Sequence, residues 1–193
     1  LRQRVRHGGA GEQGGGPGPA PAAPTPPSAP SPPRNHHAFM SETVDRLPDE
    51  KPPVRYPRTP GHRPEPADNP LNAWYVRTDL RGAPEGKLAG KRIAVKDITM
   101  IAGVPMMNGA SVLEGFVPDV DATIVTRILD AGGHIVGKSV CEYFSFSGGS
   151  ATSATGPVIS ARNPGHTPGG STTGSAALLA AGEVDLATGA DQA

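Results

Sequence analysis

The sequence predicts an α/β fold in which helices flank a mixed β-sheet. Short apolar runs alternate with stretches of helical periodicity over the second half of the chain, and glycine pairs or prolines separate them. An alanine-rich stretch near the C-terminal end lies between two such runs. Because strands and helices that alternate along a chain usually form layers around one sheet, an α/β architecture is the expected result.

Three apolar runs have the length and composition of short strands. Lys91–Lys96 and His134–Lys138 are rich in aliphatic residues, and their lengths suit buried strands. Val184–Thr188 is the third run. We expect these three segments to form the sheet.

Two segments have the pattern of helices. Asp121–Ala131 is predicted to begin at Asp121 as the N-cap and to end at Gly132-Gly133. Ser171–Ala181 is rich in alanine and predicts a second helix, after a loop over Gly156–Thr167 that glycine and proline punctuate. The apolar face of the first helix comprises Ile124, Val125, Ile128 and Leu129.

The first 39 residues predict a disordered tail rich in proline, glycine and alanine. Residues 1–39 hold 9 of the 23 prolines and 7 of the 26 glycines, with almost no large apolar side chains. Such a segment cannot bury enough surface to offset its ordering entropy. A polyproline ligand for an SH3-like partner is one interpretation. An upstream translation artefact, with Met40 as the true start, is the interpretation we favour.

The remainder divides into a strap and a globular part. Residues 40–82 predict an irregular, proline-rich strap, and residues 83–193 the globular domain. Tyr56, Trp74 and Tyr75 lie in the strap. Aromatic side chains on an extended arm usually pack over a core, so we expect the strap to cover the domain.

Composition excludes several classes of protein. With 18 basic and 18 acidic residues the net charge is zero, and neither a nucleic acid nor a membrane surface is an expected partner. No apolar run approaches membrane-spanning length, and the N-terminus lacks the apolar core of a signal peptide. The single cysteine, Cys141, cannot form an internal disulfide, which favours a reducing, cytoplasmic compartment.

Two segments carry residues suited to catalysis. Pro168–Leu178 packs glycines and hydroxyls against the start of a helix, where backbone N–H groups stabilise an anion. Lys96 ends an apolar run, and burial of an ammonium favours loss of its proton. A neutral lysine near serines is a base beside a nucleophile relay. Position alone favours a solvated lysine and an ordinary serine N-cap.

These segments together resemble the amidase signature family of serine hydrolases, which use a lysine, a serine in a cis peptide and a nucleophilic serine. The resemblance runs from near Asp45 to the C-terminal end and implies the N-terminal part of that family's domain, with its mixed sheet incomplete. Asn69–Tyr75 is similar to the acylamide amidases of bacteria and fungi in particular. The other matching segments are Pro53–Gly61, Ala94–Asp97, Gly103–Gly109, Asn163-Pro164, Pro168–Leu178 and Gly189–Ala193.

The resemblance implies a role for each of three side chains. Lys96 would be the general base and later the general acid, neutral at rest. Ser171, after a cis peptide bond, would shuttle the proton between Lys96 and the nucleophile. Ser175, four residues further on, would share a helix face with Ser171 and support the lysine by hydrogen bonding. Thr173 stands where the family has glycine, which predicts a change in backbone angle or nearby packing.

The C-terminal segment would complete the site. The resemblance implies that Gln192 and Ala193 contribute backbone N–H groups to an oxyanion hole and that Asp191 orients their loop. A plain turn aspartate is the alternative for Asp191. In the family a glycine and the nucleophilic serine come next, so the expected nucleophile lies two positions beyond Ala193. We therefore expect a truncated and inactive fragment.

The expected activity is that of an amidase, which hydrolyses carboxylic amides to the acid and ammonia through an acyl-enzyme. The A subunit of a glutamyl- or aspartyl-tRNA amidotransferase is one alternative, and a non-catalytic truncated product is another. A small amide is the expected ligand, with neither cofactor nor metal, and the full-length protein is a candidate homo-oligomer. The amide itself does not follow from the sequence.

Other candidates for chemistry are weaker. Cys141 has no basic partner nearby in sequence, so a buried thiol is a better interpretation than a nucleophile. The six histidines lack zinc-site spacing. The glycine-serine run lacks the ending of a phosphate-binding loop, and no Gly-x-Ser-x-Gly elbow occurs.

Overall fold

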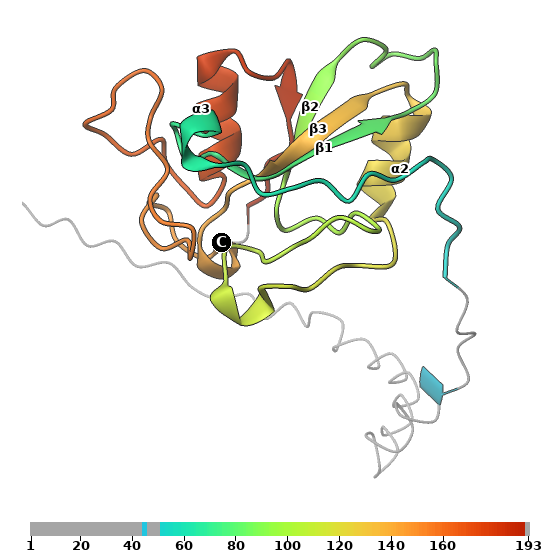
Figure 1. Cartoon of the computed structure of the whole chain (residues 1–193), viewed down its shortest axis with the longest axis horizontal. Coiled ribbons are helices and arrows are strands. Elements are labelled where there is room, and N and C mark those ends of the chain that lie inside the picture. The colour runs from blue at the N-terminus through green and yellow to red at the C-terminus, as the bar shows by residue number, and fades with distance from the viewer. Residues whose placement is uncertain (1–43, 46–50, 192–193) are drawn as a thin grey trace, which may run out of the picture. The chain divides into compact units, whose positions relative to one another are not determined.

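A computed structural model describes residues 44–45 and 51–191. The described residues from Lys51 onward belong to one compact unit, drawn in colour in Figure 1. The expected disorder of residues 1–39 lies outside the described residues, as do the expected roles of Gln192 and Ala193.

The centre of this unit is a mixed sheet, as the sequence predicts, but it has four strands where the sequence predicts three. Its strands follow the order β1-β3-β2-β4. The pair of β2 and β3 is parallel, as is the pair of β2 and β4, whereas β1 runs antiparallel to β3. The bounds are β1 Trp74–Arg81, β2 Arg92–Lys96, β3 His134–Ser139 and β4 Leu186–Ala187.

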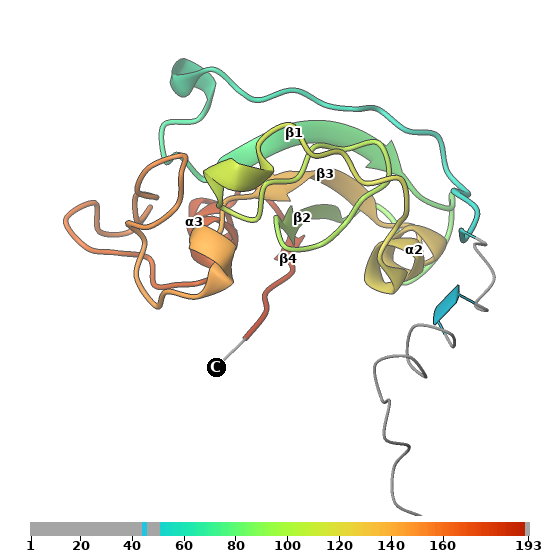
Figure 2. The same ribbon diagram turned by 90° about the horizontal axis from the view of Figure 1, so that it is seen from below.

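Two α-helices accompany the sheet. Helix α2 (Thr123–Asp130) precedes β3, and helix α3 (Thr173–Ala181) precedes β4. Figures 1 and 2 show α2 near one end of β3 and α3 beside β2 and β4. From Lys51 to Asp191 the structure also has three short 3-10 turns: η1 Pro66–Asp68, η2 Ser111–Leu113 and η3 Tyr143–Ser145.

The expectation of an irregular strap over residues 40–82 is wrong for its last part, because residues 74–81 form β1. This strand starts with the buried Trp74, Tyr75 and Val76 and continues with partly exposed polar residues, and it forms one edge of the sheet. Residues ahead of it run alongside that edge, and His62 forms an isolated antiparallel bridge with Arg77 (Figure 2). Three consecutive buried residues at its start hide the alternation of apolar and polar residues that identifies a strand with one exposed face.

The predicted helix starts need correction. Asp121 does not cap α2, because the N-cap is Ala122. The Asp121 carboxylate instead accepts a hydrogen bond from the backbone N–H of Ala102 and forms an ion pair with Arg58. Ile124 is 46% exposed, so the buried face of α2 is Val125, Ile128 and Leu129. These three side chains pack into the core with β2 and β3.

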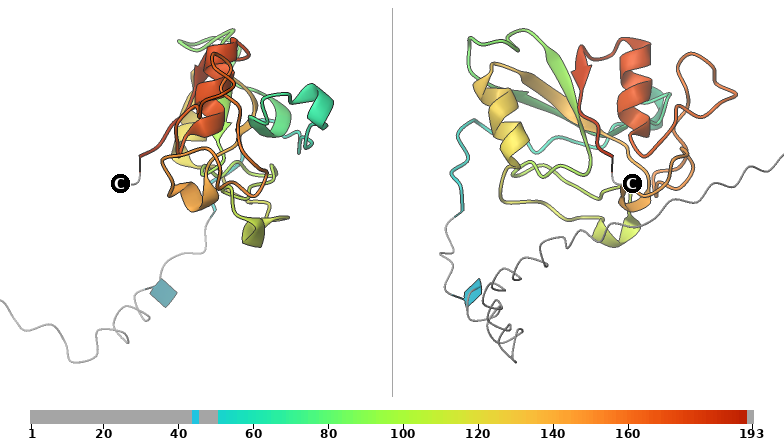
Figure 3. Two further views of the ribbon diagram at one scale, coloured as in Figure 1. Left: turned by 90° about the vertical axis from the view of Figure 1, so that its left-hand side faces the viewer. Right: turned by 180° about the vertical axis from the view of Figure 1, so that it is seen from behind.

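The core is one continuous apolar cluster. It joins β1, β2 and β3 to both helices and to the segment around Ile101 and Val104. Lys96, Lys138 and Glu142 are fully buried beside it. Among the described residues, no helix is both long and apolar enough to cross a membrane. Figure 3 shows α3, β4 and the described C-terminal segment on one side of the unit.

Candidate active site

The structure brings Lys96 and Ser171 together. Lys96 is the last residue of β2 and its side chain is fully buried. Its Nζ lies 2.8 Å from Ser171 Oγ and 3.3 Å from the carbonyl oxygen of Ala190. Its backbone N–H donates to Thr188 Oγ1 at 2.8 Å, which ties the end of β2 to the segment after β4. Lys96 is therefore held at both its backbone and its amine.

The surroundings of Lys96 favour its neutral form. Burial lowers the pKa of the Lys96 amine below its ordinary value of 10.5, while the Cys141 thiol and the Asp191 carboxylate act in the opposite direction. Burial acts this way because an ammonium loses more hydration than a neutral amine. A neutral amine has a lone pair, so Lys96 is able to accept a proton from the hydroxyl that it contacts.

Ser171 follows a cis peptide bond, as the resemblance implies. The bond joins Gly170 to Ser171. A Cβ at Gly170 would lie 2.1 Å from the carbonyl oxygen of Gly149, so the backbone here packs against the loop at residues 147–149. Ser171 itself lies before α3, which begins at Thr173, so the expected helix face shared with Ser175 is wrong.

Ser175 is connected to the lysine indirectly, through one intervening residue. Its hydroxyl donates to the carbonyl oxygen of Thr188 at 2.8 Å and lies 2.7 Å from Ser139 Oγ. Within the described part of the chain, Lys96 Nζ donates to Ser171 and Ala190, so the hydrogen bonding expected between Ser175 and the lysine is not direct. Ser175 supports Lys96 through Thr188, which accepts from the lysine's backbone.

Thr172 and Thr173, the two threonines of the segment Pro168–Leu178, are compatible with the fold of that segment. Thr172 Oγ1 donates to Ala190 O at 3.2 Å. Thr173 is buried in the first turn of α3, and its hydroxyl donates to Val140 O at 3.3 Å. Its φ is not positive, so the expected change of backbone angle at Thr173 is not needed.

A cavity of about 300 Å³ opens beside Ser171. Asp191 is part of its lining and is exposed, which places it where the sequence predicts a residue of the site. Phe146, which is 91% exposed, forms one wall. The other lining residues are Ser145, Ser147, Gly148 and Gly170.

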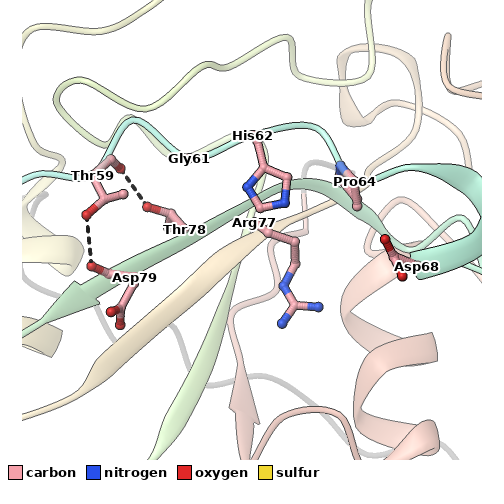
Figure 4. A pocket seen from close by; sticks show the side chains of 8 residues that line it. All are labelled: Thr59, Gly61, His62, Pro64, Asp68, Arg77, Thr78 and Asp79. Carbon is pink, nitrogen blue, oxygen red and sulfur yellow. Dashed lines mark hydrogen bonds between the residues drawn. The ribbon is translucent and has the colours of Figure 1, made fainter.

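A larger hollow lies elsewhere. It has a volume of about 540 Å³ and is formed where residues 59–64 cross β1 (Figure 4). Its polar side chains include His62, Arg77 and Asp79, and the Arg77 guanidinium lies 4.6 Å from the Trp74 ring centre. Neither Lys96 nor Ser171 lines it. We place the candidate site at the smaller cavity because Ser171, the hydrogen-bond partner of the Lys96 amine, lines it.

Sequence reasoning missed a buried ion pair next to the site. Lys138 Nζ lies 2.7 Å from Asp97 Oδ1, and both side chains are almost wholly inaccessible. Burial raises the pKa of Asp97, and the Lys138 ammonium and two backbone N–H groups oppose that rise. The feature of the sequence that pointed to this pair was Lys138, a lysine inside an apolar strand. It lies one residue before Ser139, which is the register partner of Lys96.

Comparisons with known proteins identify the family of this chain. The family model described as Amidase matches residues 70–193. The chain is 48% identical over 160 residues to an enantioselective amidase of Rhodococcus rhodochrous, covering 80% of this chain and 30% of that protein. It is 44% identical over 120 residues to the A subunit of the glutamyl-tRNA(Gln) amidotransferase of Haloarcula marismortui, covering 62% and 28%.

Solved structures show the same likeness. The crystal structure of the A subunit of glutamyl-tRNA(Gln) amidotransferase from Thermotoga maritima is similar with a TM-score of 0.53 and 31% identity, over 60% of this chain and 26% of that one. A 6-aminohexanoate cyclic dimer hydrolase is similar with a TM-score of 0.52 and 27% identity, over 53% and 22%. The chain thus spans less than a third of each of these four relatives. Since the family model matches well over half of the chain, the protein belongs to the Amidase family, the amidase signature hydrolases.

Proposed function

We propose that this chain supplies the proton-transfer half of an amidase that hydrolyses carboxylic amides to the acid and ammonia. The observation that carries the proposal is the 2.8 Å contact between the buried Lys96 amine and the Ser171 hydroxyl. The lowered pKa of Lys96 supports a base at this position. The family relation supports amides as the substrate class.

The geometry supports a two-step proton relay. As a nucleophilic serine attacks the amide carbon, its proton passes to Ser171 Oγ, and the Ser171 proton passes to the lone pair of Lys96 Nζ. The reverse transfer then protonates the leaving amine, the C–N bond breaks and ammonia departs. Water hydrolyses the acyl-enzyme by the same relay. The resemblance implies that the nucleophile lies two positions beyond Ala193.

A second candidate uses the same two residues. The A subunit of a tRNA amidotransferase would release ammonia from an amide and pass it to another site, and the 44% identity to the Haloarcula marismortui protein supports this alternative. The 48% identity to the Rhodococcus rhodochrous amidase extends over 160 residues rather than 120, which favours a free amidase.

The proposal extends to ligand and location. A small amide fits the cavity of about 300 Å³ beside Ser171. Cys141 is buried and forms no disulfide, which supports a reducing compartment such as the cytoplasm.

The test needs the rest of an amidase domain. We define the extended protein as the full 193-residue chain followed by the part of the Rhodococcus rhodochrous amidase beyond its matched segment. Ammonia release from propionamide is the assay. Lys96→Arg and Ser171→Ala should each lower kcat by at least about 10³-fold, because a guanidinium cannot accept a proton and alanine interrupts the relay.

Lys91→Arg is the matched control, because Lys91 is exposed immediately before β2. It should leave kcat unchanged. A Lys96→Arg protein with the rate of the unsubstituted one would show that Lys96 is a structural cation, and the proposed relay would be wrong. Glutamine-dependent activity that appears only when the other components of an amidotransferase are added would favour the second candidate.

A further inference from the structure

A path of hydrogen bonds leaves the site from Asp97, the residue after Lys96. Asp97 Oδ2 accepts from the backbone N–H of Met107 at 3.0 Å and of Asn108 at 2.8 Å. Its other oxygen faces the Lys138 ammonium at 2.7 Å. The carboxylate therefore fixes the 107–108 segment to the end of β2, and Lys138 compensates its charge.

Asn108 continues this path to the turn η3. Its Oδ1 accepts from Ser145 Oγ at 3.0 Å and from Cys141 Sγ at 3.5 Å. Its carbonyl oxygen accepts from the N–H of Phe144 at 3.0 Å. One asparagine thus holds three residues of the segment 141–145, and one of them, Ser145, lines the cavity.

The same segment holds Ser171. The backbone N–H of Glu142 donates to the carbonyl oxygen of Ser171 at 3.2 Å. Residues 141–145 are therefore tied to Asn108 on one side and to Ser171 on the other. The path begins beside Lys96 and returns to its hydrogen-bond partner, so it spans the two ends of the 2.8 Å contact.

The turn is conformationally unfavourable without such support. Asn108, Phe144 and Ser145 have φ values of 47°, 48° and 57°, in the left-handed region. Asparagine tolerates this region, whereas a bulky aromatic residue rarely adopts it. Of the non-glycine residues with positive φ in the described part of the chain, one lies outside this path, Asn72.

We propose that Asn108 is a positioning residue for the Lys96–Ser171 pair, acting through the turn at residues 141–145. The inference rests on the proposed amidase function of that pair. Asp97 and Lys138 anchor Asn108, and Asn108 keeps the turn in the conformation that binds the Ser171 carbonyl. Asn108 touches neither the lysine amine nor the serine hydroxyl, so its effect is on their separation and alignment.

The test separates the effect of the Asn108 amide side chain from the effect of its backbone conformation. In the extended protein, Asn108→Gly accepts a positive φ without strain but removes the Oδ1 acceptor. We expect kcat to fall by about 10²-fold with little change in KM, because a shift of about 1 Å in reacting groups has that effect. Hydrogen exchange at the Glu142 and Phe144 amides should accelerate. Asn108→Asp keeps an acceptor oxygen and should restore most of kcat.

Asn72→Gly is the matched control. Asn72 has a φ of 51°, and its Nδ2 donates to the carbonyls of Thr155 and Gly156, away from the cavity. This variant should lose side-chain hydrogen bonds without loss of kcat.

Two results would overturn the inference. One is an Asn108→Gly protein with unchanged kcat. The other is a loss of kcat that Asn108→Asp does not rescue and that accompanies global destabilisation, because that pattern describes a purely structural residue. Failure of the proposed function can be distinguished from failure of this inference, because Lys96→Ala would then leave the rate of amide hydrolysis unchanged. The exchange rates at Glu142 and Phe144 would still show whether Asn108 holds the turn.

Discussion

Gly174→Ala tests how closely α3 approaches the sheet. Gly174 is buried in the first turn of α3, and its N–H donates to Val140 O at 2.9 Å. A Cβ there would lie 2.5 Å from Ala73 O and 2.6 Å from Val140 N, against an ordinary contact of at least 3.4 Å. The start of the helix must therefore move by nearly 1 Å to accept one methyl group.

The expected magnitude follows from two opposing effects. Overpacking of this kind costs about 1–3 kcal/mol, whereas replacing glycine by alanine within a helix stabilises it by up to about 1 kcal/mol. We expect a net loss of about 1–2 kcal/mol in the free energy of unfolding. Because Ser171 lies three residues upstream, a shift approaching 1 Å should also lower kcat by up to about 10²-fold.

Urea unfolding and propionamide turnover of the extended protein measure both effects. Gly165→Ala is the control, because its added Cβ would meet its nearest neighbour, Asn163 Oδ1, at 3.6 Å. It should change neither quantity. A Gly174→Ala protein as stable and as active as the unsubstituted one would refute the close packing of α3 on Ala73 and Val140, which adjoin β1 and β3.

Four further predictions concern charged or ionisable groups. Lys138→Met should destabilise the extended protein by about 3–5 kcal/mol in urea unfolding, because it leaves the Asp97 carboxylate without compensation, and adding Asp97→Asn should recover most of this loss. Burial raises the pKa of Cys141 from 9.0 to about 11, so the folded protein should resist Ellman's reagent at pH 8 and react once unfolded. Since the unfolded thiol ionises first, this group's contribution to stability should decline as pH rises from 9 towards 11, measurable by comparison with Cys141→Ala. The rate of amide hydrolysis should rise as Lys96 deprotonates and level off below pH 10.5, and a plateau reached only above that pH would contradict a base of lowered pKa.

The parts of the fold that followed from the sequence are those with a local signal. The strands β2 and β3 are short apolar runs, and both helices are marked by periodicity or alanine content. The pairing of Lys96 with Ser171 came from the family resemblance, because a lysine at a strand end and a serine before a helix are each ambiguous alone.

What could not be predicted depends on tertiary context. Strand β1 follows a proline-rich stretch and acquires its edge partner from residues around His62, which lie outside the sheet's strands. Asp121 has the position of a cap, yet Arg58 and Ala102 bind its carboxylate instead. A helix that began at Ser171 would place Ser171 and Ser175 on one face, but α3 begins two residues later.

The buried pair of Asp97 and Lys138 illustrates a further limit. Alternation along β2 and β3 sets Val95 opposite Lys138 and Lys96 opposite Ser139, so the two lysines project from opposite faces of the sheet. Only the three-dimensional structure shows that Asp97 forms an ion pair with Lys138, whereas Lys96 forms a hydrogen bond with Ser171. A lysine inside an apolar run gave no indication of its partner.

The most direct measurement of the central claim is the titration of Lys96 itself. Carbon-13 labelled lysine in the extended protein gives one Cε signal per lysine, and the signal lost in Lys96→Arg identifies Lys96. The proposed relay predicts a midpoint clearly below 10.5 for Lys96, with the exposed Lys91 as the internal reference. A Lys96 signal that titrates at or above 10.5 would show a permanent ammonium at this position and would contradict its role as the base.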